Sequence, residues 1–201
     1  METPSFPKRD PADAEFWDLR YQASFAPWDA GRVPQHLREF AGRTPPPGRV
    51  LVPGCGSAWD VRFLAELGWD VVGIDFSRQA VAAARAVLGP HAARVRHADF
   101  FAPLPEAPFA LVYERAFLCA LPRRLWPDWG RRVAQLVAPG GVLAGFFFYD
   151  EGERGPPFPL HHAAELEALL APTFTRVEDL PVTDSIAAFA GRERWQAWRR
   201  Q

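Results

Sequence analysis

Two glycines and an aspartate in the first half of the sequence have the types and the spacing needed to bind a nucleoside. Gly54 and Gly56 follow the apolar run at residues 49–53, and glycine allows a sharp turn with a close approach of the backbone to a ligand. Asp75 ends the next apolar run, about twenty residues further along, where a carboxylate can accept hydrogen bonds from both hydroxyls of a ribose. Together these residues predict a site for a nucleoside-containing cofactor.

The residues around this glycine turn argue against two other nucleotide-binding motifs. A dinucleotide-binding fingerprint would have a third glycine at position 59, where it lets the helix pack closely on the strand, but this sequence has Trp59. A phosphate-binding P-loop needs a lysine after the glycines, and none follows here. The sequence therefore weakens a dehydrogenase hypothesis and excludes a P-loop.

Asp99 and Phe100 follow a third short apolar run and could bind an adenine ring. The carboxylate would accept a hydrogen bond from the exocyclic amine, while the aromatic side chain covers a face of the ring. Either residue could equally cap a loop, so the adenine role depends on the interpretation of Gly54, Gly56 and Asp75.

The elements that position these residues alternate along the chain. Apolar runs rich in β-branched residues predict strands, while apolar residues at helical spacing predict helices, one of them with Ser77 as its cap and Gly89 as its stop. Repeated βα units predict an α/β fold with a doubly wound, mostly parallel sheet and helices on both faces. We expect an irregular, aromatic segment over 1–48, strands near 49–53, 70–75, 94–97, 109–113, 142–149 and 175–180, helices near 61–67, 78–88, 125–137 and 162–170, and a tail ending in 192–200.

Length and composition restrict the class of protein. A chain of 201 residues can bury one sizeable core, so we expect a single domain over 1–201. The formal net charge of -1 gives no basis for broad attraction to nucleic acid or anionic lipid, and no stretch reaches the roughly twenty apolar residues of a membrane span. With two cysteines and no secretory signal pattern, we expect a cytoplasmic protein without a structural metal, whose partner is a small molecule and whose oligomeric state is not predicted.

Seven segments, in order over nearly the whole chain, resemble those of one protein family. They are FWDLRY, APWDAGRVPQHL, VLVPGCGSAWD, VVGIDFS, ERAFLCALP, VAPGG and GPPF. With the glycine turn, Asp75 and Asp99, the sequence resembles a class I S-adenosylmethionine-dependent methyltransferase and, more narrowly, the thiopurine S-methyltransferase family with its thiol and halide methyltransferase branch. The resemblance implies a seven-stranded Rossmann-like sheet, S-adenosyl-L-methionine as cofactor with S-adenosyl-L-homocysteine as product, and methyl transfer to a small soft nucleophile such as a thiol, a thiopurine or a halide.

In this family the N-terminal segment, here residues 1–48, folds over the cofactor as a lid. Aromatic faces suit a sulfonium because ring quadrupoles attract a poorly hydrated cation; alternatively, these rings only pack the segment onto the core. The cofactor-binding residues that the resemblance implies are Trp17, Tyr21, Trp28, Gly54, Gly56, Asp75, Phe76, Asp99, Phe100 and Arg115.

Arg115 follows the fourth predicted strand, and the resemblance implies that it lies where the acceptor meets the methyl group. Its guanidinium would lower the pKa of a thiol by favouring the anion, which makes Arg115 the catalytic candidate. The thiopurine branch has Asp-Arg-Gly where this chain has Glu114-Arg115-Ala116, and the thiol and halide branch usually has a tyrosine at the Arg115 position, so the branch stays open. Alternatively, Arg115 pairs with Glu114 or a surface carboxylate.

The acceptor site is expected to have an apolar wall. Its implied residues are Trp28, Arg115, Pro156, Pro157 and Phe158. His161 and His162 could supply a base, although at a helix start such residues more often face solvent or cap the helix. Two alternative functions stay open: N- or O-methylation of a small heteroaromatic metabolite, which a general base near the acceptor would favour, and a non-catalytic cofactor-binding regulatory module.

Overall fold

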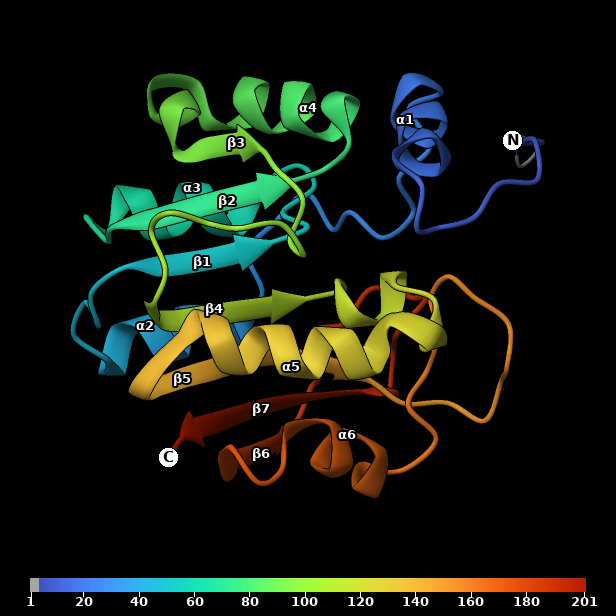
Figure 1. Ribbon diagram of the computed structural model, residues 1–201. Coiled ribbons are helices and arrows are strands. Elements are labelled where there is room, and N and C mark those ends of the chain that lie inside the picture. Colours follow the sequence, from blue (N-terminus) through green and yellow to red (C-terminus); the bar gives the residue numbers. More distant parts are fainter. Residues whose placement is uncertain (1–3) are drawn as a thin grey trace.

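A single sheet organises the computed structural model, which describes residues 4–201 (Figure 1). Within these residues seven strands pair in the order β3-β2-β1-β4-β5-β7-β6. Strands β1 to β5 form the parallel part, and β7 is antiparallel to both β5 and β6. The strands are β1 (Val50–Pro53), β2 (Val71–Asp75), β3 (Val95–His97), β4 (Phe109–Arg115), β5 (Val137–Phe148), β6 (Phe174–Pro181) and β7 (Glu193–Arg200). The predicted doubly wound, mostly parallel sheet is confirmed.

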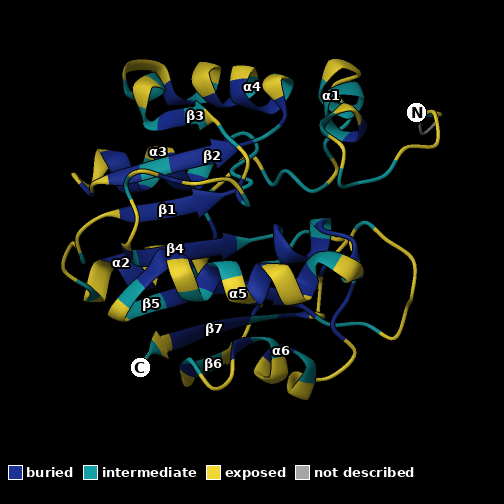
Figure 2. Cartoon of the chain, in the orientation of Figure 1, coloured by how far each residue is buried: buried dark blue, intermediate teal, exposed yellow. Residues whose placement is uncertain are grey.

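Helices cover both faces of this sheet, and the central strands β1, β2 and β4 are mostly buried (Figures 1 and 2). Because side chains alternate along a strand, Val50 and Val52 of β1 join the apolar core under α2, α3 and α4, whereas Leu51 joins the core under α5 and α6. The helices are α1 (Ala14–Gln22), α2 (Gln35–Arg43), α3 (Trp59–Glu66), α4 (Arg78–Leu88), α5 (Trp126–Leu136) and α6 (Ala163–Leu170). In residues 4–201, none of the helices combines the length and the apolarity needed to cross a bilayer.

Helix α4 forms where the sequence predicts it. The Ser77 hydroxyl accepts a hydrogen bond from the Ala80 N–H at 3.0 Å and so caps the first turn. Gly89 ends the helix with a φ of +54°, a conformation that glycine adopts without strain. This helix therefore starts at the carboxyl end of β2, directly after Asp75.

The N-terminal segment differs from the irregular structure expected for it, because it contains both α1 and α2. Helix α2 buries Leu37, Phe40 and Ala41, a helical spacing that was present in the sequence. Helix α1 buries Phe16 of its own side chains and packs beside α4, beyond the carboxyl ends of the parallel strands (Figure 1). Its stability comes from contacts with distant parts of the chain, so its local sequence pattern is weak.

Candidate active site

A cavity of about 590 Å³ lies at the carboxyl ends of β1, β2 and β4, with α1 and the segment after it on the opposite side. Residues from the glycine turn, the end of β2, the loop after β3 and the end of β4 line it. This is the edge of a doubly wound sheet at which strand order reverses, between β1 and β4, and where ligands bind in such folds.

The glycine turn after β1 has little free space on either side. Gly54 and Gly56 have φ values of +54° and +51°, in the left-handed region. A Cβ on Gly54 would overlap the ring of Phe117, and a Cβ on Gly56 would lie 2.7 Å from the Tyr21 hydroxyl. Only glycine fits at both positions, which leaves the turn's backbone exposed to the cavity.

The carboxyl group of Asp75 connects the end of β2 to this turn. One oxygen accepts a hydrogen bond from the Gly56 N–H at 3.0 Å, and the other accepts one from the Ser77 N–H at 2.9 Å. Burial raises the pKa of Asp75 to about 6, although both N–H donors oppose the rise. Each oxygen keeps a further lone pair, so two ribose hydroxyls would fit as additional donors that stabilise the charged form.

The pair that follows β3 lies at the Asp75 end of the cavity, and Asp99 caps a turn there. Asp99 is exposed and accepts a hydrogen bond from the Phe101 N–H at 2.9 Å, so its carboxylate caps a turn. Phe100 is buried, with its ring edge-on to Phe117 at 5.0 Å between centroids. Asp99, Phe100 and Phe76 all line the cavity beside the Asp75 end.

Helix α1 is attached beside the Asp75 end of the cavity by Asp18, which sequence reasoning missed. One Asp18 oxygen accepts hydrogen bonds from the Ser77 hydroxyl at 2.6 Å and from the Gln79 N–H at 3.1 Å. Further along, Arg32 donates to the Asp184 carboxylate at 2.8 Å and so connects the segment before α2 to the loop before β7. The N-terminal segment is thus fixed at both ends of the cavity.

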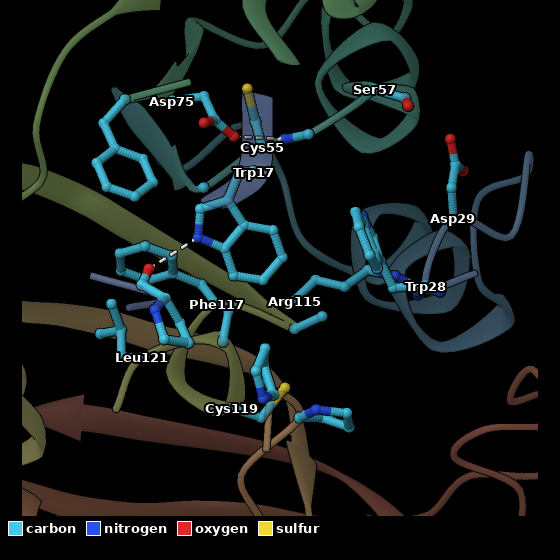
Figure 3. Close-up of a pocket in the computed structure, with 18 of the residues that line it drawn as sticks. Trp17, Trp28, Asp29, Cys55, Ser57, Asp75, Arg115, Phe117, Cys119 and Leu121 are labelled. Carbon is cyan, nitrogen blue, oxygen red and sulfur yellow. Dashed lines mark hydrogen bonds between the residues drawn. The ribbon is translucent and has the colours of Figure 1, made fainter. Parts of the chain in front are cut away.

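The three aromatic side chains predicted to face the cofactor, Trp17, Tyr21 and Trp28, line the cavity. Figure 3 shows Trp17 and Trp28. The rings of Trp17 and Trp28 meet edge-on at 5.3 Å between centroids, and those of Tyr21 and Trp28 at 6.0 Å. The indole N–H of Trp17 donates to the Pro11 carbonyl at 2.8 Å, which fixes this ring in the cavity. Such a group of ring faces fits a sulfonium cation.

Arg115 ends β4 and projects into the cavity near Trp28 (Figure 3). Its Nε lies 3.9 Å from a carboxylate oxygen of Asp60, and its guanidinium carbon lies 5.0 Å from the centre of the Phe146 ring. Glu114 is not its partner, because successive side chains of a strand point to opposite faces. Instead, one Glu114 oxygen accepts hydrogen bonds from the N–H groups of Phe117 and Leu118 at 2.8 and 3.0 Å.

Asp60 lies in the first turn of α3, and no sequence pattern indicated that it belongs to the site. It is 9% exposed and lines the cavity, and its Oδ1 makes no hydrogen bond to any described residue. Burial raises the pKa of Asp60 to about 6, while the Arg115 guanidinium acts to lower it. The Arg115 end of the cavity therefore holds a carboxyl group and a guanidinium close together.

The other residues expected near the acceptor divide into two groups. Pro156 and Pro157 line the cavity, whereas Phe158 does not and instead packs its ring over Gly155 and against the core under α5. His161 and His162 are exposed and do not line the cavity. Cys119 does line it, and burial raises the pKa of its thiol well above the ordinary value, which keeps it protonated.

Residues 4–201 include no group of three or more His, Cys, Asp and Glu side chains able to hold a metal ion.

Comparison with known proteins identifies the family. The family described as Thiopurine S-methyltransferase matches residues 12–201. The chain is 33% identical over 195 residues to "Probable thiol methyltransferase 2" of Arabidopsis thaliana, covering 92% of this chain and 84% of that protein. It is 29% identical over 190 residues to "Thiocyanate methyltransferase 1" of Brassica oleracea, with the same coverage of 92% and 84%.

A solved structure agrees with the fold. The 1,6-didemethyltoxoflavin-N1-methyltransferase of Burkholderia thailandensis, crystallised with its substrate and S-adenosylhomocysteine, superposes with a TM-score of 0.73 at 19% identity, covering 98% of this chain and 93% of that one. At that identity the likeness concerns the fold alone. Together with the sequence relatives, the glycine turn, Asp75 and the aromatic cavity lead to one conclusion. The chain is an S-adenosylmethionine-dependent methyltransferase and belongs to the thiopurine S-methyltransferase family.

Proposed function

We propose that this enzyme transfers the methyl group of S-adenosyl-L-methionine to a small thiol-type acceptor held beside Arg115. The observation that carries the proposal is a guanidinium at the end of β4, inside a cavity whose walls are mostly apolar and aromatic. Relatives named for thiol and thiocyanate methylation support a soft acceptor. A soft nucleophile needs alignment and a favoured anionic form more than it needs polar recognition.

The cofactor occupies the half of the cavity around Asp75 in this proposal. Asp75 accepts the ribose hydroxyls, the backbone of Gly54 and Gly56 contacts the methionine part, and Asp99 with Phe76 and Phe100 surrounds the adenine. Trp17, Tyr21 and Trp28 lie over the sulfonium. The bound cofactor supplies a methyl group that is already electrophilic, so the protein contributes alignment and exclusion of water.

The acceptor occupies the other half. Arg115 stabilises negative charge on the acceptor sulfur and so lowers its pKa. Trp28, Pro156 and Pro157 provide flat apolar surfaces, and Phe158 supports the two prolines from behind by packing on Gly155. The predicted lid comprises residues 1–48, of which 1–3 lie outside the described residues. Residues 4–48 act as the lid of a single domain, since their attachments through Asp18 and Arg32 span both halves.

Release of S-adenosylhomocysteine tests this function. The acceptors are aromatic thiols, thiopurines, hydrosulfide, iodide and heteroaromatic amines, and the proteins are the wild type, Arg115→Ala and the control Arg131→Ala. Arg131 pairs with Asp128 on the exposed side of α5, outside the cavity. We expect thiol turnover to fall about 10²-fold in Arg115→Ala, as when one stabilising donor is removed, and to persist in the control.

The alternative functions predict different results. Turnover restricted to amines or hydroxyls would support a heteroaromatic N- or O-methyltransferase, the alternative that a carboxyl group beside Arg115, such as that of Asp60, also favours. Cofactor binding without turnover of any acceptor would support a regulatory module. Equal losses in the two arginine variants would remove Arg115 from the mechanism.

A further inference from the structure

The carboxyl group of Asp60 has two polar neighbours, the Arg115 guanidinium and the Tyr113 hydroxyl, and both act to lower its pKa. Asp60 comes from α3, whereas Arg115 comes from β4, and the two meet at 3.9 Å on the wall of the same cavity. The second Asp60 oxygen is buried and makes no hydrogen bond within residues 4–201. A buried acceptor oxygen without a donor carries a desolvation cost that a ligand able to donate a hydrogen bond would remove.

The charges around Arg115 do not form an anion site. Besides Asp60, the carboxyl group of Glu193 from β7 acts on the guanidinium, and Asp29 of the N-terminal segment acts on Asp60. Arg32 also lines the cavity, but it is held by Asp184. The Asp184 carboxyl group also interacts with Arg115 and Glu193. The Tyr113 hydroxyl and the Cys55 thiol stay protonated, because burial raises the pKa of each.

We propose that Asp60 accepts the proton of the methyl acceptor, and that the site therefore takes neutral thiols in preference to permanent anions such as thiocyanate or iodide. This inference rests on the proposed methyl transfer to sulfur. A permanent anion would enter beside the carboxyl groups of Asp60 and Glu193. Arg115 would be the guanidinium that attracts it, and these two carboxyl groups already compensate the charge of Arg115. A neutral thiol instead brings the donor that the unpartnered Asp60 oxygen lacks.

The step balances in atoms and charge. The S–H bond of the acceptor breaks, its proton moves to the Asp60 carboxylate, and the electron pair stays on the acceptor sulfur. That sulfur forms the new S–CH₃ bond while the old bond between methyl and sulfonium breaks, its pair remaining on the departing sulfur. The sulfonium loses its positive charge and the Asp60 carboxylate loses its negative charge in the same step, so the net charge of the buried site does not change. Asp60 then releases the proton to water.

The environment of Asp60 suits this exchange. Burial raises its pKa to about 6 from an ordinary value of 3.8. The gap between the pKa of Asp60 and that of an ordinary thiol, about 8.5, therefore becomes smaller by about two pKa units. Arg115 makes the gap smaller still because it lowers the pKa of the thiol, since a positive neighbour favours the anion of an acid. Proton transfer between groups of closer pKa is the condition for effective general-base catalysis.

The test compares Asp60→Asn and Asp60→Glu with the control Asp70→Asn, which changes an exposed carboxyl group paired with Arg49. Aliphatic thiols such as 2-mercaptoethanol, which stay protonated at neutral pH, are measured against thiocyanate and iodide over a range of pH. We expect Asp60→Asn to lower kcat/KM for thiols at neutral pH by about 10²-fold or more, as for loss of a general base. The loss should shrink at high pH, where thiols ionise in solution, and Asp60→Glu should recover part of the activity.

The same variants give a readout that does not depend on turnover. Isothermal titration of thiocyanate and iodide into the protein with S-adenosylhomocysteine should show tighter anion binding by Asp60→Asn than by the wild type. An infrared difference spectrum between these two proteins should contain a carboxylic acid band that titrates near pH 6.

Equal losses for thiols and anions at every pH, with unchanged anion binding, would overturn the proposal and leave Asp60 as a residue that positions Arg115. A wild type that methylates no sulfur acceptor would instead refute the function proposed above. The two failures are distinguishable, because the first requires active wild-type enzyme.

Discussion

Replacing Glu114 by glutamine should change how the stability of the fold depends on pH. Glu114 is 1% exposed. Burial raises the pKa of its carboxyl group from 4.5 to about 7, although the N–H groups of Leu118 and Phe117 oppose the rise. Between these two values the folded state holds a proton that the unfolded chain has released, so the stabilisation is complete below pH 4.5 and is lost as the pH rises towards 7. At about 1.4 kcal/mol per pKa unit, the whole window is worth about 3 kcal/mol.

Glutamine keeps the hydrogen bonds but cannot ionise. A single Glu114 oxygen accepts both backbone hydrogen bonds, so the amide oxygen can replace it. The amide nitrogen then takes the place of Oε2, which makes no hydrogen bond within residues 4–201, and that cost is the same at every pH. The difference in unfolding free energy between variant and wild type should therefore move by about 3 kcal/mol in favour of Glu114→Gln between pH 4.5 and 7.5.

Urea unfolding at a series of pH values, followed by tryptophan fluorescence, measures this difference. Asp60 and Asp75 also have raised pKa values, but they contribute equally to both proteins and cancel. Parallel stability curves for the two proteins would refute the reasoning, because they would mean that Glu114 has the same pKa in the folded and unfolded states.

Two further predictions concern the cofactor half of the cavity. Asp75→Asn should weaken S-adenosylhomocysteine binding by about 10-fold to 100-fold in isothermal titration, since a charged hydrogen-bond acceptor worth about 1.5–3 kcal/mol is lost; affinity equal to that of Asp70→Asn would contradict the ribose role. Asp18→Ala removes the acceptor for the Ser77 hydroxyl and the Gln79 N–H. Limited proteolysis should then cut within 1–48 sooner, and S-adenosylhomocysteine should slow cleavage more in the wild type; identical cleavage would argue against the attachment.

Features that depend on neighbouring residues could be predicted from the sequence. The bounds of α4 followed from a serine cap and a glycine stop, both local devices. Gly54 and Asp75 could be paired because the βα unit between them brings the ends of adjacent parallel strands to the same edge of the sheet. The fold class and the meeting of the glycine turn with Asp75 followed from such units.

Features that depend on contacts between distant parts of the chain could not be predicted from the sequence. Asp60 and Arg115 are separated by β2, α4 and β3, and the sequence does not indicate that α3 directs Asp60 towards Arg115. Helix α1 was missed because it is held by α4 and buries Phe16 alone of its own side chains. The orientation of Phe158 was not predictable for a similar reason, since it depends on how the chain returns past Cys119, whose carbonyl accepts the Phe158 N–H at 2.7 Å.

The order of the last strands has a consequence for synthesis on the ribosome. Strand β6 precedes β7 in the chain but lies outside it, and in the described sheet its backbone pairs with β7 alone. During translation β6 therefore emerges without a place in the sheet, and it must wait until β7 has been made and has inserted beside β5. In that interval an unpaired strand with exposed Val177 and Leu180 can pair with other chains. We expect the nascent protein to be most prone to aggregation at this late stage, after the cofactor half has already been synthesised.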